Sequence, residues 1–355
     1  MTFFSFKYSS FTFSLLLFFN FLVINSARAE TDWWTSSFYL DNDLFSDTDD
    51  GYTNGIRFSA VSPDLDDFDE DPILPSWLRS INRKLGFFRG DEIDLQRNMV
   101  VTLGQQMYTL DERYIDRTDV VEEDRPYAGW LYVGFGYQVS NFNRLDTAVF
   151  NIGVVGPSSR ADDVQNTVHD ARGFDKYQGW DNQLRDELGL QWLYTRKHKF
   201  YQPIDVGKLG YDIITQWGGS LGNVATYLEA GAEFRFGWNL PKDFGTSSAS
   251  PGGDNSSPGS RFDSRVRNIL FGGLHGFMAV NGRWVLHDIT LDGNTFSDSH
   301  SVDKEPLVGS AIVGLAMTIS RWKLSFSRQF ITDQFKGQED SKGYGTVSIS
   351  YTHTF

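Results

Sequence analysis

Apolar and polar residues alternate strictly along the last residues of the chain. Over positions 347–355, odd-numbered sites hold Val, Ile, Tyr, His and Phe, and even-numbered sites hold Ser and Thr. A period of two indicates an extended strand, because successive side chains point to opposite faces. One apolar face, one small polar face and a terminal aromatic are typical of the closing strand of a barrel in lipid. An ordinary half-buried strand also alternates, so the rest of the chain must decide.

The same alternation recurs along the whole chain. It is clear at 129–140, 146–156 and 224–237, where charged residues share a face with glycine, as suits a wet lumen. Further strands are predicted at 33–43, 53–61, 97–108, 189–200, 210–219, 266–280, 283–291, 306–320, 321–331 and 343–355. Bacterial barrels have even strand numbers. Merging 266–280 with 283–291 meets that rule and predicts an all-β, transmembrane antiparallel barrel of twelve strands.

The first 29 residues differ from the rest. They contain Lys7, an apolar run over 11–24 and a small-x-small sequence, Ala27-Arg28-Ala29. This pattern predicts a secretory signal over 1–29, because the apolar run is shorter than the ~20 residues of a spanning helix. The barrel is then expected over 30–355, in the outer membrane of a Gram-negative bacterium.

Composition supports a barrel and limits the function classes. Mean hydropathy is −0.35, yet 15% of residues are aromatic, as expected for a polar lumen with outward aromatic girdles. The absence of cysteine means that closed strand pairing, not disulfides, must stabilise an exported chain. A net charge of −14 argues against nucleic-acid binding and is compatible with divalent cations.

Topology places the chemically suggestive residues at one end. If the barrel begins in the periplasm, connections 44–52, 109–128 and 157–188 are extracellular, and the active site is expected there. Positions 163–172 have helical spacing, which predicts a short helix in an extracellular loop. The long connections 62–97 and 239–265 fall on the periplasmic side, and Gly/Ser-rich 245–260 is expected to be mobile.

Two clusters carry candidate chemistry near strand ends. Asp41-Asn42-Asp43 precedes the first hairpin tip and faces 51–55 across it. Carboxylate and amide oxygens are ligands that Ca²⁺ prefers, although Asx residues also simply form turns. Arg125 could clamp a phosphate or carboxylate in bidentate fashion, or could pair with its neighbours to fix the barrel rim.

His169 is the third candidate. In the predicted helix, Val164, Val168 and Ala171 form an apolar stripe, and Gln165, His169 and Arg172 form the adjacent one. Histidine titrates near neutral pH and can act as a general base, although most single histidines are structural. Neither cysteine nor a Gly-x-Ser-x-Gly elbow is present, so a hydrolase of this sequence would activate water with metal assistance.

These residues resemble a known family, the outer-membrane lipid A 3′-O-deacylases. The resemblance covers essentially the whole mature chain, and its specificity comes from several motifs in order rather than from any one. The matching residues are Asp41-Asn42-Asp43, 51–55, 105–109, 124–132, 164–169, 173–180 and Gln183.

The resemblance implies a calcium-dependent ester hydrolase that removes an acyl chain from lipid A in the outer leaflet. It assigns catalytic roles to Asn42, Asp43, Thr53 and His169, and it makes Asp43 and Asp175 metal ligands. Ile115 stands where the family has a functional lysine. Arg113 and Arg117 are the expected cationic substitutes, and with Arg125 they form the expected substrate-binding set.

Two other functions fit the same residues. An outer-membrane phospholipase would keep the chemistry and change the substrate, whereas a non-catalytic porin-like barrel would use the motifs only to fix its loops. The expected partners are lipid A or lipopolysaccharide and outer-membrane lipids, and the barrel is expected to be a monomer.

Overall fold

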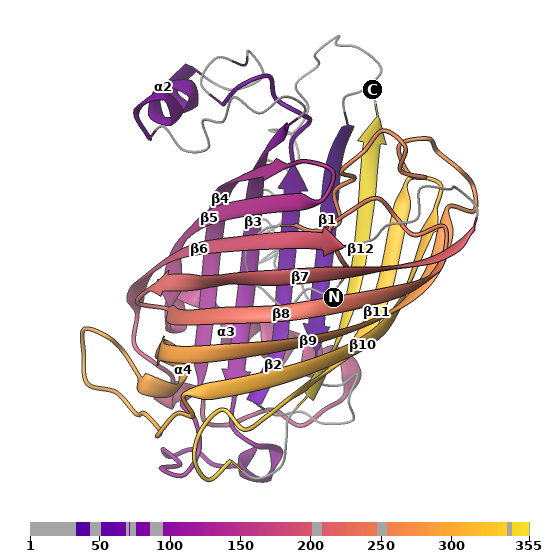
Figure 1. Ribbon diagram of the computed structural model, residues 1–355. Helices are drawn as coiled ribbons and strands as arrows, with labels where there is room; N and C mark the ends of the chain where they lie inside the picture. Colours follow the sequence, from indigo (N-terminus) through magenta and orange to yellow (C-terminus); the bar gives the residue numbers. More distant parts are fainter. Residues whose placement is uncertain are drawn as a thin grey trace, which may run out of the picture.

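The chain forms a closed antiparallel barrel of twelve strands, with β1 paired to β12 (Figure 1). The computed structural model describes residues 33–42, 51–68, 71, 76–85, 95–200, 208–246, 254–338 and 343–354, so the predicted signal lies outside the described residues. The strands are β1 (Trp33–Asn42), β2 (Gly51–Val61), β3 (Gln96–Thr109), β4 (Ala128–Ser140), β5 (Arg144–Val155), β6 (Glu187–Phe200), β7 (Leu209–Gly222), β8 (Ala225–Trp238), β9 (Gly273–Asp288), β10 (Leu307–Ile319), β11 (Trp322–Ile331) and β12 (Gly343–Thr354).

The predicted alternation sets the two faces of the wall. In β12, Ser348, Ser350 and Thr352 are buried in the lumen. In β8, Phe234 and Phe236 are exposed on the outside, and the charged side chains between and beside them point inward. Apolar side chains outside and polar side chains inside reverse the order of a soluble sheet, as expected for a wall surrounded by lipid. The predicted fold class is confirmed. No described helix is long and apolar enough to span a membrane.

The two ends of the barrel carry different structures. We name the end where β1 begins and β12 finishes the base, and the opposite end the rim. The helix α2 (Ser76–Leu85) lies at the base, and α3 (Ala161–Arg172) and α4 (Ile289–Asp292) lie at the rim (Figure 1). Three 3-10 helices are η2 (Glu112–Tyr114), η3 (Pro157–Ser159) and η4 (Trp180–Asn182).

The merged strand is confirmed with shorter bounds. A single β9 joins the two predicted segments, but 266–272 is not a strand. The chain turns into α4 after Asp288, whose carboxylate accepts a hydrogen bond from the Thr290 amide at 2.9 Å. This cap satisfies an amide that would otherwise continue the strand ladder, so the helix replaces the predicted strand end.

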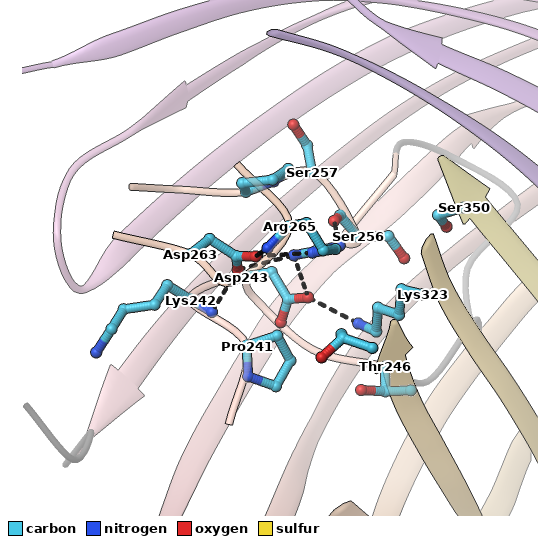
Figure 2. A network of polar contacts seen from close by, with 12 residues as sticks. Pro241, Lys242, Asp243, Thr246, Ser256, Ser257, Asp263, Arg265, Lys323 and Ser350 are labelled. Atoms are coloured by element: carbon cyan, nitrogen blue, oxygen red, sulfur yellow. Dashed lines mark hydrogen bonds and ion pairs between the residues drawn. The ribbon is translucent and has the colours of Figure 1, made fainter. Parts of the chain in front are cut away.

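The connection after β8 folds into the lumen at the base. We name its described part, residues 239–246 and 254–272, the plug. Asp243 contacts Lys323 of β11 at 2.7 Å and Arg265 at 3.1 Å (Figure 2). It also contacts Arg235 of β8 at 2.5 Å, and all four side chains are essentially buried. Charges removed from water require such partners.

The plug contradicts part of the expected mobility of 245–260. Tyr39 of β1 donates a hydrogen bond to the buried Asp254 at 3.1 Å, and Gln138 of β4 donates to the Asp254 carbonyl at 2.8 Å. Arg265 donates to the Ser256 carbonyl at 2.5 Å. Residues 254–260 are therefore ordered although their composition resembles a linker, because the polar lumen supplies partners for their backbone and side chains.

An apolar cap fills the lumen at the rim. Trp130 and Tyr132 of β4 stack at 4.2 Å between ring centroids and pack with buried residues from several connections. The other buried members are Ala128, Val155, Leu184, Val224 and Ile289. A polar cavity of about 170 Å³ borders this cap and is lined by Arg57, Tyr227, Arg283 and Tyr344 among others.

Candidate functional site on the outer wall at the rim

The helix α3 begins against the outside of the barrel. Trp130 points into the lumen, so the preceding Gly129 faces outward. A Cβ added at Gly129 would collide with Ser159 and Ala161, so glycine is what permits this close approach. Gln105 of β3 donates a hydrogen bond to the Ser159 carbonyl at 2.7 Å. The start of α3 is thereby fixed to β3 and β4.

The predicted helix is confirmed, but its buried stripe differs from the predicted apolar one. Ala161, Gln165 and His169, four residues apart, are all buried, whereas Val164 and Val168 are only half-buried. Trp180 of η4 donates a hydrogen bond from Nε1 to Gln165 Oε1 at 2.7 Å. A polar stripe can face the wall because the connection after α3 supplies its hydrogen-bond partner.

His169 is held by the turn that follows α3. Gly173 has a φ of 72°, the left-handed conformation that ends a helix and reverses the chain. This turn brings the Asp175 carbonyl oxygen to 2.5 Å from His169 Nδ1. A carbonyl only accepts hydrogen bonds, so Nδ1 carries the proton in the neutral ring and the lone pair lies at Nε2.

Aromatic and apolar residues join His169 to the strands. Its ring lies 6.3 Å from that of Tyr177, centroid to centroid. Tyr177 belongs to a buried cluster with Met107, Leu110, Val121, Tyr127, Ala161 and Trp180. Met107 of β3 is the strand partner of Asn54 in β2, and Asn54 is the partner of Asn42 in β1. The sequence-predicted His169 and Asn42 thus belong to one region of the outer wall.

Strand alternation separates the residues of the first acidic cluster. Tyr39 and Asp41 face the lumen, where Asp41 accepts a hydrogen bond from Thr346 Oγ1 at 2.8 Å. Asn42 therefore faces outward. Arg57 stacks over Tyr39 in the lumen at 4.1 Å, so Asn54, three residues earlier, also faces outward. Asn42 and Asn54 are adjacent on the same side of the wall as α3.

The side chain of Asn54 has a buried oxygen atom that suits a cation ligand. Its side chain is 6% exposed, and its Oδ1 atom has no hydrogen-bond partner among the described residues. A buried, unpaired amide oxygen is costly, and amide oxygens are ligands that Ca²⁺ accepts. The amide oxygen of Asn54 therefore fits a hard cation such as Ca²⁺. Sequence reasoning gave Asn54 no role; its position beside Thr53, opposite Asn42, was the available signal.

The remaining predicted site residues are Asp43, Thr53 and Asp175. Asp43 lies outside the described residues. Thr53 occupies an irregularity in the β2–β3 pairing between Tyr52 and Asn54, which places its backbone next to Met107. Asp175 supplies its carbonyl to His169, and its side chain is exposed. Within the described ranges, no group of three His, Asp or Glu side chains could by itself hold a metal.

The predicted substrate-binding arginines occupy two sides of the wall. Arg125 is buried inside the rim, where its guanidinium lies 5.0 Å from the Tyr108 ring centroid and donates to Gln334 Oε1 at 3.0 Å. These contacts tie together loops at the lumen side, away from His169.

Arg113 and Arg117 lie outside the barrel, beside the buried cluster that contains Tyr177. Arg113 is partly exposed near Asp111, at 3.6 Å. Arg117 makes two side-chain hydrogen bonds to Asp119, at 2.7 and 2.8 Å, and these hold the pKa of Asp119 below its usual value. Ile115, between the two arginines, packs against the same cluster. Both arginine side chains are partly exposed, and exposed ion pairs exchange partners at little cost.

Fold and site together define an outer-membrane β-barrel with a histidine-bearing helix packed on its outer wall. The family model described as "Outer membrane protein LpxR" matches residues 11–353, and the chain belongs to the LpxR family. In such barrels the termini face the periplasm, so we expect the base to be periplasmic and the rim extracellular.

A solved structure shows the same fold. LpxR from Salmonella typhimurium superposes with a TM-score of 0.67 at 19% identity, covering 89% of this chain and 99% of that one. The β domain of the Bordetella autotransporter BrkA has a TM-score of 0.40 at 9% identity and covers 92% of this chain and 99% of its own. No curated protein matches the chain.

Proposed function

We propose that this protein is a calcium-dependent ester hydrolase that removes the 3′-linked acyl chain of lipid A in the outer leaflet. The observation that carries the proposal is the setting of His169, buried on the outer wall with Nδ1 held by the Asp175 carbonyl at 2.5 Å. A histidine placed there meets a lipid headgroup from the membrane side rather than a solute in the lumen.

In the proposed reaction, Nε2 of His169 accepts a proton from water as the water oxygen bonds to the acyl carbonyl carbon. The ester C–O bond then breaks, the acyl chain leaves as a fatty acid, and the proton passes from His169 to the departing sugar oxygen. Asn42 and Thr53 orient the water or the ester. Bound Ca²⁺ would supply positive charge for the developing oxyanion, a type of stabilisation that is worth roughly 3–4 kcal/mol per donor in enzymes. Asp43, Asp175 and the amide oxygen of Asn54 would hold the cation, and Arg113 and Arg117 would contact the lipid A phosphate.

The outer wall supports a lipid substrate. Acyl chains can lie along outward apolar side chains of the neighbouring strands, such as Phe135 of β4 and Ile152 of β5, while the ester reaches the rim. The substrate then stays in the bilayer throughout the reaction, and no transfer of long chains into water is required.

A porin-like function receives less support. The plug and the cap both occupy the lumen, and the plug is held by buried ion pairs. An open diffusion pore needs a continuous water-filled channel, which these segments interrupt. A phospholipase would use the same chemistry at the same place, so the products must separate the two.

Mass analysis of extracted lipids tests the proposal. Cells that express the protein should contain lipid A lighter by the 3′-linked acyl group, and chelation of external Ca²⁺ should prevent the change. Unchanged lipid A together with lysophospholipid would identify a phospholipase instead. Unchanged lipids of both kinds, with folded protein in the outer membrane, would remove the enzymatic function.

A further inference from the structure

At the base, part of the outer wall is covered by protein rather than left to lipid. Leu65 and Phe68, from the segment after β2, pack on Met99 of β3 and Val139 of β4, and all four are buried. Gln138 points into the lumen toward Asp254, so Val139 and Tyr137 face outward. The segment 62–68 therefore lies against the membrane side of the barrel.

The helix α2 is attached to this same surface by Asn82. Its Nδ2 donates a hydrogen bond to the Phe68 carbonyl at 2.7 Å, and its Oδ1 accepts one from the Tyr137 hydroxyl. The Tyr137 ring meets Phe68 edge-on, at 4.9 Å between centroids. Figure 1 shows α2 beside the ends of β4 and β5 rather than over the barrel mouth. The helix is thus held next to the wall, at the level of the base.

One side of α2 presents large apolar residues to the surroundings. Trp77 is 57% exposed and Ile81 is 44% exposed, and their spacing of four places them on one face. Ser76 and Arg83 are exposed on other faces, and Lys84 lies at the end of the apolar face. Leaving a tryptophan and an isoleucine in water forfeits the stabilisation that burial of their apolar area would give.

The surrounding wall indicates what covers this face. Exposed aromatic residues mark other parts of the base, namely Phe142 in the β4–β5 turn and Phe200, Trp238 and Trp322 at strand ends. Such a girdle marks the membrane interface of a barrel. At β3 and β4 the corresponding wall positions are covered by 62–68, and Trp77 lies just beyond that cover. The exposed face of α2 therefore adds apolar residues to the aromatic girdle, at a greater distance from the barrel wall.

We propose that α2 is an interfacial helix that inserts Trp77 and Ile81 into the periplasmic leaflet of the outer membrane. Amphipathic helices of this type lie in the plane of the interface with the apolar face in the lipid. The helix contains Arg79, Arg83 and Lys84 and no acidic residue, but the preceding segment 64–71 is strongly acidic. Apolar insertion, rather than attraction to anionic lipid, is therefore the driving force.

Site-directed labelling tests this proposal directly, because the chain contains no cysteine. Ile81→Cys and Trp77→Cys place an environment-sensitive fluorophore on the apolar face. Ser76→Cys, on another face of the same helix, is the matched control. Each labelled protein is reconstituted in phosphatidylcholine vesicles that contain a lipid with a nitroxide near the headgroup, and folding is checked by gel mobility without heating.

The expected result is a blue-shifted probe, quenched several-fold more strongly at positions 81 and 77 than at 76. The difference should persist in high salt, since no anionic lipid is present. Equal, water-like emission at all three positions would overturn the proposal. A blue shift at 81 without lipid quenching would overturn it too, because another part of this chain or a second copy would then cover the face.

Discussion

His169 Nδ1 lies 2.5 Å from the carbonyl oxygen of Asp175, six residues later in the chain. The contact uses the backbone of Asp175, so the tautomer of His169 depends on the turn at Gly173 rather than on the Asp175 carboxylate. One residue can therefore serve twice, with its carbonyl orienting the histidine and its exposed carboxylate remaining available to a cation. This arrangement explains why the two residues are close in sequence.

His169→Ala should abolish deacylation while the barrel still folds, since α3 is a surface element outside the strand ladder. Loss of a general base typically lowers the rate by ~10²–10⁴. Lipid A mass analysis with purified, heat-modifiable protein measures the effect. His353→Ala, at the base, is the control and should keep wild-type turnover. Normal activity in the His169 variant would place the base elsewhere.

Gly129→Val should also lower deacylation strongly, because any Cβ at this site collides with Ser159 and Ala161 and must displace the start of α3. The β-branched residue itself is well suited to a strand. Gly282→Val in β9 is a matched control, because a Cβ there meets no atom within 4 Å. Equal activity in both variants would show that the seat of α3 on β4 is irrelevant to the reaction.

Calcium dependence should change with the oxygen ligands. Asp43→Asn keeps an oxygen and removes charge, so half-saturation should move to higher Ca²⁺ with activity partly recovered at excess; Asp43→Ala should lose both. Asn54→Ala should likewise raise the Ca²⁺ needed. Activity measured against free Ca²⁺ checks this, with Mg²⁺ expected to substitute poorly. Wild-type titrations in all three variants would remove these residues from the metal site.

Asp243→Ala should loosen the plug, because it leaves Lys323 and part of the Arg265 and Arg235 charge unpaired inside the lumen. Breaking a buried pair costs about 3–5 kcal/mol. Gel mobility after stepwise heating should show that this barrel unfolds at a lower temperature than wild type. Asp298→Ala, at an exposed rim position, removes the same charge and should unfold like wild type. An unchanged unfolding temperature in the Asp243 variant would mean that its ion pairs do not stabilise the plug.

The plug should resist acid down to low pH. Burial alone would raise the pKa of Asp243, but Lys323, Arg235 and Arg265 outweigh it and hold the pKa well below the usual range. A lowered folded-state pKa gives stability that is complete above the unfolded value, about 3.9, and is lost as pH falls below it. The unfolding temperature should therefore be unchanged from pH 7 to 5 and fall only below about pH 4. A lower unfolding temperature between pH 7 and 5 would contradict this assignment.

The sequence by itself determined the wall of the barrel. Alternation with a period of two is a local property, and it decides which side chains meet lipid and which meet the lumen. Strands, their even number, the merged β9 and the helix α3 could therefore be predicted from residues such as 224–237 and 343–355. The ordered motifs also pointed to His169 and Asn42 as neighbours on one rim.

Only the tertiary structure decided where the connections go. The sequence does not show that Asp243 will meet Lys323, 80 residues away, so the plug looked like a linker. Nor does it show that Arg125 turns inward to Gln334, or that Asn54 buries an amide oxygen beside Asn42. Such contacts depend on which distant groups the closed barrel brings together, and burial of a polar or charged group is tolerated only where those partners arrive.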